Sequence, residues 1–468
     1  MRGLILWGAP LEPPSRSWGP RTARDGPRRG CDSGFKQRGQ DMGHGGRGPA
    51  GTLESPIPDV PVDQAAADRD PVLILGGGLM GLAIAHQLAR RGTAVLVLSR
   101  RRSEAAGFVA AGMLAPHAEG LQGSLLELGQ QSLQRIPAWV AQIEADGGSS
   151  CGLRPCGIVV PFPTIAERDR YPTAAWGQPL DRAALEREAP GIGPRWQAGL
   201  LFEQDGQIDN RRRLMRALER ACVALGVAFQ EGSEVLELQQ NGRGALAGVR
   251  LRTAEGDERQ LPARRAVLTG GAWSARLLPQ LPVFPVKGQM LSLQGPRQAL
   301  RRVIFGPGTY LVPRHDGLLV VGATSEPEAG FADGLTPFGQ RQLQDGIAAL
   351  LPQASQWPPM ERWWGFRPCT PDQAPLLGPS PIEGLWLATG HHRNGVLLAA
   401  ITAELLGVAL DPEGGSVEQD LPAGIRSCLL EAFRWDRFMA PSVSPPGASP
   451  QSARQSGTVN AAPVQPPG

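Results

Sequence analysis

The stretch VLILGGGLMGLAIAHQLARRGTAVLVL, residues 72–98, decides the fold of this chain. It opens with a continuous apolar run at 72–75, as a buried parallel strand requires. A helix is predicted over 79–91, because small and apolar residues recur there at helical spacing. A second buried strand is predicted over 94–98. This order of strand, glycine-rich turn, helix and strand is typical of dinucleotide-binding domains.

The turn carries the pattern GxGxxG, and each of its glycines has a physical role. Gly76 permits the tight turn, Gly78 lets a pyrophosphate approach the backbone, and Gly81 lets the helix pack closely on the strand. The first turn of the helix, with Leu79 and Met80, presents free N–H groups and the positive end of the helix dipole to the phosphates. A dinucleotide cofactor is therefore predicted here.

Strands and helices alternate again later in the chain, and an antiparallel pattern interrupts them. A helix at 214–224 and a strand at 266–269 precede the interruption, and a strand at 385–389 and a helix at 395–406 follow it. Between about 275 and 330, apolar runs separated by Pro, Gly and Asp turns predict an antiparallel sheet. Its runs are 283–286, 290–293, 310–313 and 318–321. We therefore predict an α/β fold: a Rossmann-like dinucleotide-binding domain with an inserted antiparallel-sheet substrate domain of α+β type.

Composition sets the domain bounds. Residues 1–70 are predicted to be a disordered extension and linker, and 441–468 a disordered Pro/Ser-rich tail, because neither shows hydrophobic periodicity. The cofactor domain is predicted to be discontinuous and the substrate domain to consist of insertions. The cofactor domain takes 71–150, 200–275 and 366–440, and the substrate domain takes 151–199 and 276–365.

Charge and composition exclude several classes of protein. The net charge of +3 is too small for a strongly basic nucleic-acid binder. No apolar run reaches the roughly 20 residues of a membrane span, so no membrane insertion is expected. The six cysteines form no CxxC pair, which favours reduced thiols in a cytoplasm. No metal site is predicted, since His391 and His392 are adjacent and have no acidic cluster near them.

The end of the second strand leaves the nucleotide open. Ser99 stands where many dinucleotide-binding domains carry an acidic residue, and Arg100, Arg101 and Arg102 follow it. This pattern favours a 2′-phosphate and hence an NADP-binding reductase. The alternative is three solvated arginines beside a serine that still bonds a ribose hydroxyl.

Three further segments resemble the D-amino-acid-oxidase superfamily of flavoproteins, and within it the glycine oxidases of thiamine biosynthesis. They are AAGMLAPHAE (110–119), VLTGGAWS (267–274) and ATGHHRNGVLLAA (388–400). The resemblance spans roughly 71–440, with FEQDGQID (202–209), TYLVPR (309–314) and GFRP (365–368) in the expected order. It implies FAD, bound noncovalently, as the cofactor.

The resemblance also implies which residues bind FAD. Small residues at 110–112 let the backbone lie close to a flat ring, which Met113 can cover. The helix that begins near Asn394 can direct its dipole at the flavin. The implied cofactor-binding residues are Gly76, Gly78, Leu79, Met80, Gly81, Ser99, Arg100, Ala111, Gly112, Met113, Ile208, His391, His392, Arg393, Asn394, Gly395, Val396 and Leu397.

The substrate side is predicted from Tyr310 and Arg367. An arginine offers a planar fork that binds a carboxylate through two hydrogen bonds. By the resemblance this pair holds the carboxylate of an amino acid, with Arg393 near it, and no side chain acts as a catalytic acid or base. Gly308 and Ser325 depart from one branch of the glycine oxidases, which has histidine and methionine there, so the preferred substrate is left open.

The implied activity is oxidative deamination of glycine or another small amino acid or amine. Hydride passes from Cα to flavin N5, the imine hydrolyses to glyoxylate and ammonia, and dioxygen yields hydrogen peroxide. The alternatives are a sarcosine-type or D-amino-acid dehydrogenase or oxidase, an NADP-binding reductase, and a flavin-binding module without turnover. The expected partners are the substrate, dioxygen, a thiazole synthase and further copies of this chain.

Overall fold

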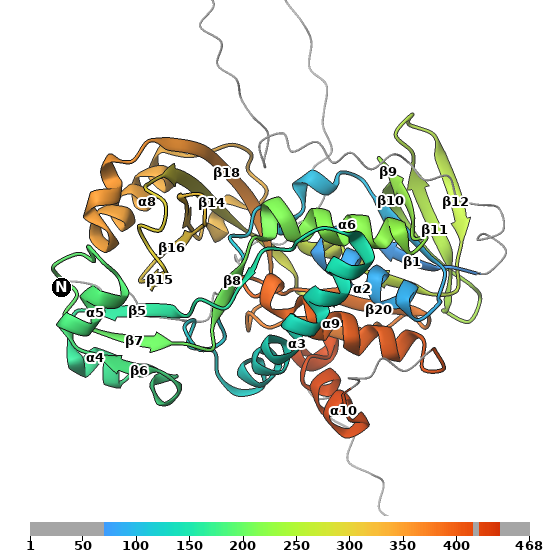
Figure 1. Ribbon diagram of the computed structural model, residues 1–468. Helices are drawn as coiled ribbons and strands as arrows, with labels where there is room; N and C mark the ends of the chain where they lie inside the picture. Colours follow the sequence, from blue (N-terminus) through green and yellow to red (C-terminus); the bar gives the residue numbers. More distant parts are fainter. Residues whose placement is uncertain (1–69, 415–420, 440–468) are drawn as a thin grey trace, which may run out of the picture. The chain divides into compact units, whose positions relative to one another are not determined.

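The computed structural model describes residues 70–414 and 421–439 (Figure 1). The predicted N-terminal extension and linker, apart from Asp70, and the predicted C-terminal tail lie outside these residues. The described residues up to Trp435 form one compact unit. A second unit begins at Asp436, within the short 3-10 helix Trp435–Phe438.

The cofactor half is built on a six-stranded sheet. Its order is β19–β20–β13–β1–β2–β9, and only the edge pair β19–β20 is antiparallel. The strands are β1 (Val72–Leu75), β2 (Val95–Ser99), β9 (Ala228–Glu231), β13 (Ala266–Leu268), β19 (Leu376–Pro379) and β20 (Leu385–Thr389). The register Val72↔Val95 and Leu73↔Ala266 places β1 at the centre, where all four of its residues are buried.

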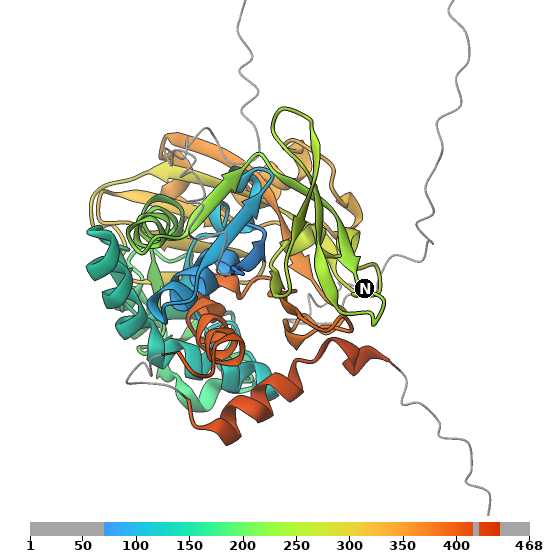
Figure 2. The same cartoon turned by 90° about the vertical axis from the view of Figure 1, so that its right-hand side faces the viewer.

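Four helices pack with this sheet in one hydrophobic core. Helix α2 (Leu79–Arg90) packs against α9 (Gly395–Leu410), and α3 (Gly123–Gly147) packs against α9 and α6 (Met215–Ala224). Figures 1 and 2 show these helices gathered together. Helix α9 is apolar nearly all round, with Glu404 as its one charged residue, because other elements bury most of its faces.

An eight-stranded sheet forms the other half. Its order is β18–β14–β17–β16–β15–β5–β7–β6. The strands are β5 (Ile158–Phe162), β6 (Gln178–Leu180), β7 (Ala198–Phe202), β14 (Phe284–Gln294), β15 (Val303–Gly306), β16 (Thr309–Pro313), β17 (Leu318–Gly322) and β18 (Pro359–Cys369). Helices α4 (Ile165–Asp169), α5 (Arg182–Glu188) and α8 (Pro337–Leu350) pack on its strands (Figure 1).

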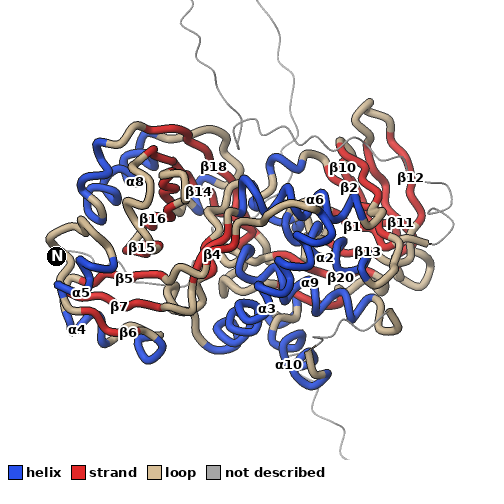
Figure 3. The backbone as a smooth tube through the Cα atoms, viewed as in Figure 1, coloured by secondary structure: helices blue, strands red, loops and turns tan. Residues whose placement is uncertain are grey.

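Two three-stranded sheets complete the fold. The first is the meander β10 (Glu234–Gln240), β11 (Leu246–Arg252) and β12 (Glu258–Pro262), which stands out in Figure 2. The second has the order β3 (Met113–Leu114), β8 (Gly206–Ile208), β4 (Leu153–Arg154) and lies between the two large sheets (Figure 3). Helix α7 (Ser274–Leu277) packs near β10, and helix α10 (Ala423–Ala432) contacts α3.

The predicted α/β fold class is confirmed, with two corrections of detail. The runs predicted as separate strands at 283–286 and 290–293 form one strand, β14, because β18 pairs with it from Phe284 to Leu293 across the polar residues between them. The inserted sheet is not purely antiparallel, since β15 and β5 pair in parallel. The domain bounds remain our proposal; the eight-stranded sheet takes its strands from residues 158–202 and 284–369.

Candidate functional site

A cavity of about 1010 Å³ lies at the carboxyl ends of β1, β2 and β13. Leu75, Ser99 and Thr269 line it from these strand ends. Tyr310 of β16 and Arg367 of β18 line it from the eight-stranded sheet. Parallel α/β sheets bind ligands outside the carboxyl ends of their strands. The volume is at the upper end of the range for small-molecule sites, as a large cofactor with its substrate requires.

The β1–α2 turn forms one wall, with the tight turn and the close helix packing that the GxGxxG pattern predicts. Gly76 has φ +129°, and a Cβ there would lie 2.7 Å from the Thr269 carbonyl oxygen. Gly78 is the N-cap of α2 and provides no side-chain cap, so the first N–H groups of the helix are open to an anion. Gly81 does not line the cavity. It lets the helix pack closely, since a Cβ there would lie 2.0 Å from the Gly76 carbonyl oxygen.

The three arginines after β2, Arg100 to Arg102, each form an ion pair with a glutamate. Arg100 lies 2.5 Å from Glu104 and 3.5 Å from Glu234, and Arg101 lies 2.7 Å from Glu104. The alternative of three solvated arginines is wrong for Arg102. Its side chain is 3% exposed and pairs with Glu231 at 2.9 Å and with Glu219 at 3.6 Å. These pairs weaken the case for a 2′-phosphate site.

The loop at residues 110–113, which we call the cofactor loop, runs along the cavity. Ala111, Gly112 and Met113 line it. Gly112 has φ +86°, and a Cβ there would lie 2.0 Å from the Ile208 carbonyl oxygen. Ile208 is buried behind the loop and donates its N–H to the Gly112 carbonyl at 2.8 Å. It therefore supports the cavity wall and does not line it.

The segment from His391 to Leu397 forms another wall. His391, His392, Arg393, Gly395 and Val396 line the cavity. The structure places Asn394 and Leu397 behind the wall. Asn394 is the N-cap of α9, and the Leu397 carbonyl accepts a hydrogen bond from Ser132 at 2.5 Å.

His391 is a neutral histidine in this wall. It is 2% exposed, and its Nε2 lies 3.1 Å from the Thr402 hydroxyl. Burial lowers its pKa to about 3, because the protein interior disfavours the charged imidazolium. No group of three or more metal-ligating side chains occurs within residues 70–414 and 421–439.

Tyr310 and Arg367 lie together in the wall that comes from the eight-stranded sheet. Arg367 donates to the Thr324 carbonyl oxygen at 3.0 Å, and the Tyr310 hydroxyl lies 3.6 Å from the Met290 sulfur. Two glycines leave room for these side chains. A Cβ at Gly288 would lie 2.3 Å from the Arg367 guanidinium, and one at Gly322 would lie 2.5 Å from the Tyr310 ring. Burial lowers the pKa of Arg367 and raises that of Tyr310.

Glu119 is a site residue that sequence reasoning missed. Its side chain is 5% exposed, lines the cavity, and lies with its Oε2 3.1 Å from the Nε of Arg393. Burial raises the pKa of Glu119, while Arg393 and Arg367 oppose that rise. Buried Asp205 accepts the N–H groups of His117 and Ala118 and so holds the turn before it. Glu119 is the last residue of the motif at 110–119, but only its ion pair with Arg393 shows that it belongs to the site.

The residues fit a flavin dinucleotide. The glycine turn and the α2 N-terminus suit a pyrophosphate, and the two open walls at the cofactor loop and the α9 N-terminus suit a flat ring. The wall from the eight-stranded sheet carries the half-buried side chains of Arg367 and Tyr310. No described helix combines the length and the apolar character that a membrane crossing needs.

This chain is similar in sequence and fold to known proteins. The family described as "FAD dependent oxidoreductase" matches residues 71–407. A bifunctional protein ThiO/ThiG of Synechocystis is 41% identical over 383 residues, which cover 80% of this chain and 55% of that protein. The chain thus spans about half the length of such bifunctional relatives.

Single-function relatives are matched over most of their length. The glycine oxidase of Geobacillus kaustophilus is 33% identical over 357 residues, which cover 72% of this chain and 92% of that protein. Its crystal structure matches with a TM-score of 0.69 and 29% identity, covering 79% of this chain and 99% of that one.

Proposed function

Since this chain belongs to the D-amino-acid oxidase family of FAD-dependent oxidoreductases, we propose that it oxidises glycine or another small amino acid or amine. Its cofactor is FAD. The relatives named glycine oxidase and ThiO support this choice of substrate class. We further propose that FAD is held noncovalently, with the contacts given above.

The observation that carries the proposal is the state of Arg367. Within the described part of the chain its guanidinium donates to a carbonyl oxygen and forms no ion pair with a carboxylate. Burial lowers the pKa of Arg367, so its charge is costly where it stands. The carboxylate of an amino acid would compensate that charge and bind bidentately.

The protein residues then act by binding and orientation. FAD, when bound, accepts the hydride that leaves the substrate Cα. Arg367 and Tyr310 hold the carboxylate end, and Arg393, which is paired with Glu119, adds positive charge nearby. The resulting imine hydrolyses to glyoxylate and ammonia, and dioxygen takes the electrons as hydrogen peroxide.

Two further proposals concern where the product goes and how the chain assembles. The bifunctional ThiO/ThiG relatives support a link to thiamine thiazole synthesis, with a thiazole synthase as the partner that receives the imine. We also propose a cytoplasmic homo-oligomer.

A peroxide assay across small substrates tests the function. The purified protein with FAD receives glycine, sarcosine, D-alanine or methylamine in air, and peroxide and glyoxylate are measured. We expect peroxide and glyoxylate in equal amounts from glycine. Flavin reduction without peroxide would indicate a dehydrogenase, and extraction of NADP from the purified protein would overturn the proposal.

A further inference from the structure

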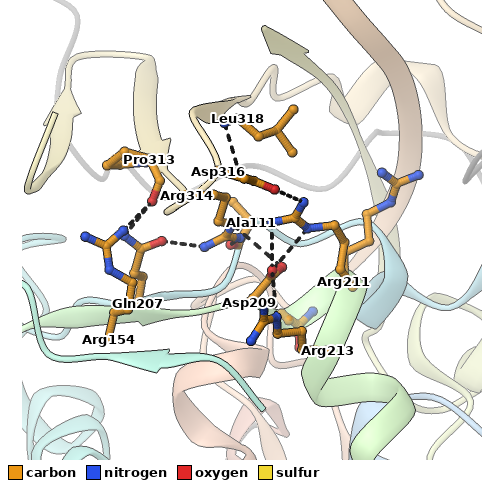
Figure 4. Close-up of polar contacts among 12 residues, drawn as sticks. Ala111, Arg154, Gln207, Asp209, Arg211, Arg213, Pro313, Arg314, Asp316 and Leu318 are labelled. Carbon is orange, nitrogen blue, oxygen red and sulfur yellow. Dashed lines mark hydrogen bonds and ion pairs between the residues drawn. The ribbon is translucent and has the colours of Figure 1, made fainter. Parts of the chain in front are cut away.

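A buried polar network joins the strand of Tyr310 to the cofactor loop. Arg314 directly follows β16 and donates through Nη2 to the Ala111 carbonyl oxygen at 2.6 Å (Figure 4). Its Nη1 donates to the Gln207 side-chain oxygen, and its Nε lies 3.6 Å from the Asp209 carboxylate. Arg314, Gln207 and Asp209 are 6%, 0% and 6% exposed, so the whole contact is shielded from water.

The rest of the network fixes Arg314 in place. Gln207 donates to the Pro313 carbonyl oxygen at 2.9 Å, next to Arg314 in the chain. Asp209 also pairs with Arg212 at 2.9 Å, and Arg212 pairs with Asp316 at 2.7 Å. Arg314 therefore has little rotational freedom, and its donors are held at fixed positions relative to the Ala111 carbonyl.

The hydrogen bond from Arg314 sets the orientation of the peptide between Ala111 and Gly112. In a planar trans peptide the N–H points opposite to the C=O. Arg314 holds this C=O toward itself and does not line the cavity, whereas Gly112 does. The Gly112 N–H therefore points away from Arg314, and among the described residues it has no hydrogen-bond partner.

We propose that Arg314 is a positioning residue that orients the Ala111–Gly112 peptide so that the Gly112 N–H is available to the bound cofactor. The proposal rests on the proposed function, because it concerns the same site. Arg314 and Tyr310 lie four residues apart, so one strand ties the substrate-side tyrosine and the cofactor loop together.

The charge of Arg314 favours this role. Burial lowers its pKa to about 10, and Asp209 opposes that shift, so the guanidinium stays protonated at neutral pH. A hydrogen bond from a charged donor to a buried carbonyl is stronger than one between neutral groups. Gly112 also has φ +86°, and its carbonyl accepts the Ile208 N–H, so the loop is held on both sides of this peptide.

The test compares Arg314→Met with Arg154→Met. Arg154 is a matched control. It donates to the Pro313 carbonyl at 2.9 Å, as Gln207 also does, but it does not reach the cofactor loop (Figure 4). Apoprotein is titrated with FAD, and the dissociation constant, the visible spectrum of the bound flavin and the melting temperature are recorded. None of these readouts requires turnover of glycine, so an inactive wild type would overturn the proposed function and leave this test intact.

We expect Arg314→Met to weaken FAD binding at least tenfold and to shift the flavin spectrum. Arg154→Met should lower the melting temperature and leave the dissociation constant and the spectrum unchanged. If Arg314→Met does not fold, Arg314→Lys is tested in its place. We expect its affinity for FAD to fall about threefold or more, because an ammonium lacks the planar fork that bonds both Ala111 and Gln207. Wild-type affinity and spectrum in a folded Arg314 variant, or equal spectral shifts in both methionine variants, would overturn the proposal.

Discussion

The Nε of Arg393 lies 3.1 Å from the Oε2 of Glu119, and both side chains line the proposed substrate cavity. The pair places a buried carboxylate beside the cations that are proposed to meet the substrate. Arg393 screens that carboxylate from the negative end of an amino acid. The electrostatic field that a substrate carboxylate would meet therefore depends on both members of the pair.

Arg393→Met should raise KM for glycine about tenfold, because the Glu119 charge would then repel the substrate carboxylate. Adding Glu119→Gln should recover a large part of this loss, since the repelling charge is removed. Steady-state kinetics of the two single variants and the double variant measure the coupling. Additive losses in the double variant would show that the pair does not act on the substrate.

Gly288→Ala should impair substrate binding without unfolding the protein. The new Cβ would lie 2.3 Å from the Arg367 guanidinium, which is the flexible end of a side chain and can shift. We expect KM for glycine to rise about tenfold and FAD content to stay normal. Gly242→Ala is the control, because a Cβ there meets nothing within 4 Å. Unchanged kinetics in Gly288→Ala would argue that Arg367 does not bind the carboxylate.

Gly112→Ala should abolish FAD binding, while Gly92→Ala should not. Both glycines have left-handed φ values, +86° and +85°, so both variants carry a backbone strain of about 1–2 kcal/mol. Only at Gly112 would the Cβ also meet a backbone atom, 2.0 Å away, whereas at Gly92 it meets nothing within 4 Å. FAD released on denaturation, per mole of protein, distinguishes them. Similar FAD content in both variants would mean that strain alone acts at Gly112.

Acid should destabilise the fold partly through His391. Its pKa is about 3 in the folded protein against 6.5 ordinarily, so below 6.5 the unfolded state binds a proton that the folded state does not. The stability contributed by neutral His391 is present above 6.5 and is lost as pH falls, by up to about 1.4 kcal/mol per pH unit. Denaturant unfolding between about pH 7 and about pH 5 should show a shallower loss in His391→Gln than in wild type. Exposed His315→Gln is the control and should follow the wild type.

The cofactor side of the site was predictable because its determinants are local. The GxGxxG turn needs glycines at fixed offsets, and Gly76 and Gly81 have the close packing that this pattern predicts. Ile208, Asn394 and Leu397 were expected to contact the cofactor, but the structure places them just behind the wall. At Asn394 and Leu397 a shift of one residue separates a lining position from a supporting one, and a motif does not resolve that difference.

The missed features are long-range pairings. From the sequence alone Arg102 can be interpreted as solvated, whereas in the structure it pairs with Glu219 and Glu231, which are far away in the chain. Glu119 gains its role from Arg393, and Arg314 from Ala111 and Gln207, all far apart in the chain. Strand β14 was divided in two because polar residues interrupt its apolar runs, yet pairing with β18 carries it across them.

Anaerobic reduction of the bound FAD tests the central claim most directly. The FAD-loaded protein and its Arg367→Ala variant are each mixed with glycine and with methylamine, which lacks the carboxylate, and loss of the flavin's visible absorption is followed. Truncating one partner of a buried charge pair costs about 2–5 kcal/mol, so glycine should reduce the variant roughly one and a half to three and a half decades less efficiently than the wild type. Methylamine should reduce the two proteins at similar rates, and their FAD contents should match. No bleaching of the wild type by any small amino acid, or equal losses with glycine and methylamine, would contradict the account.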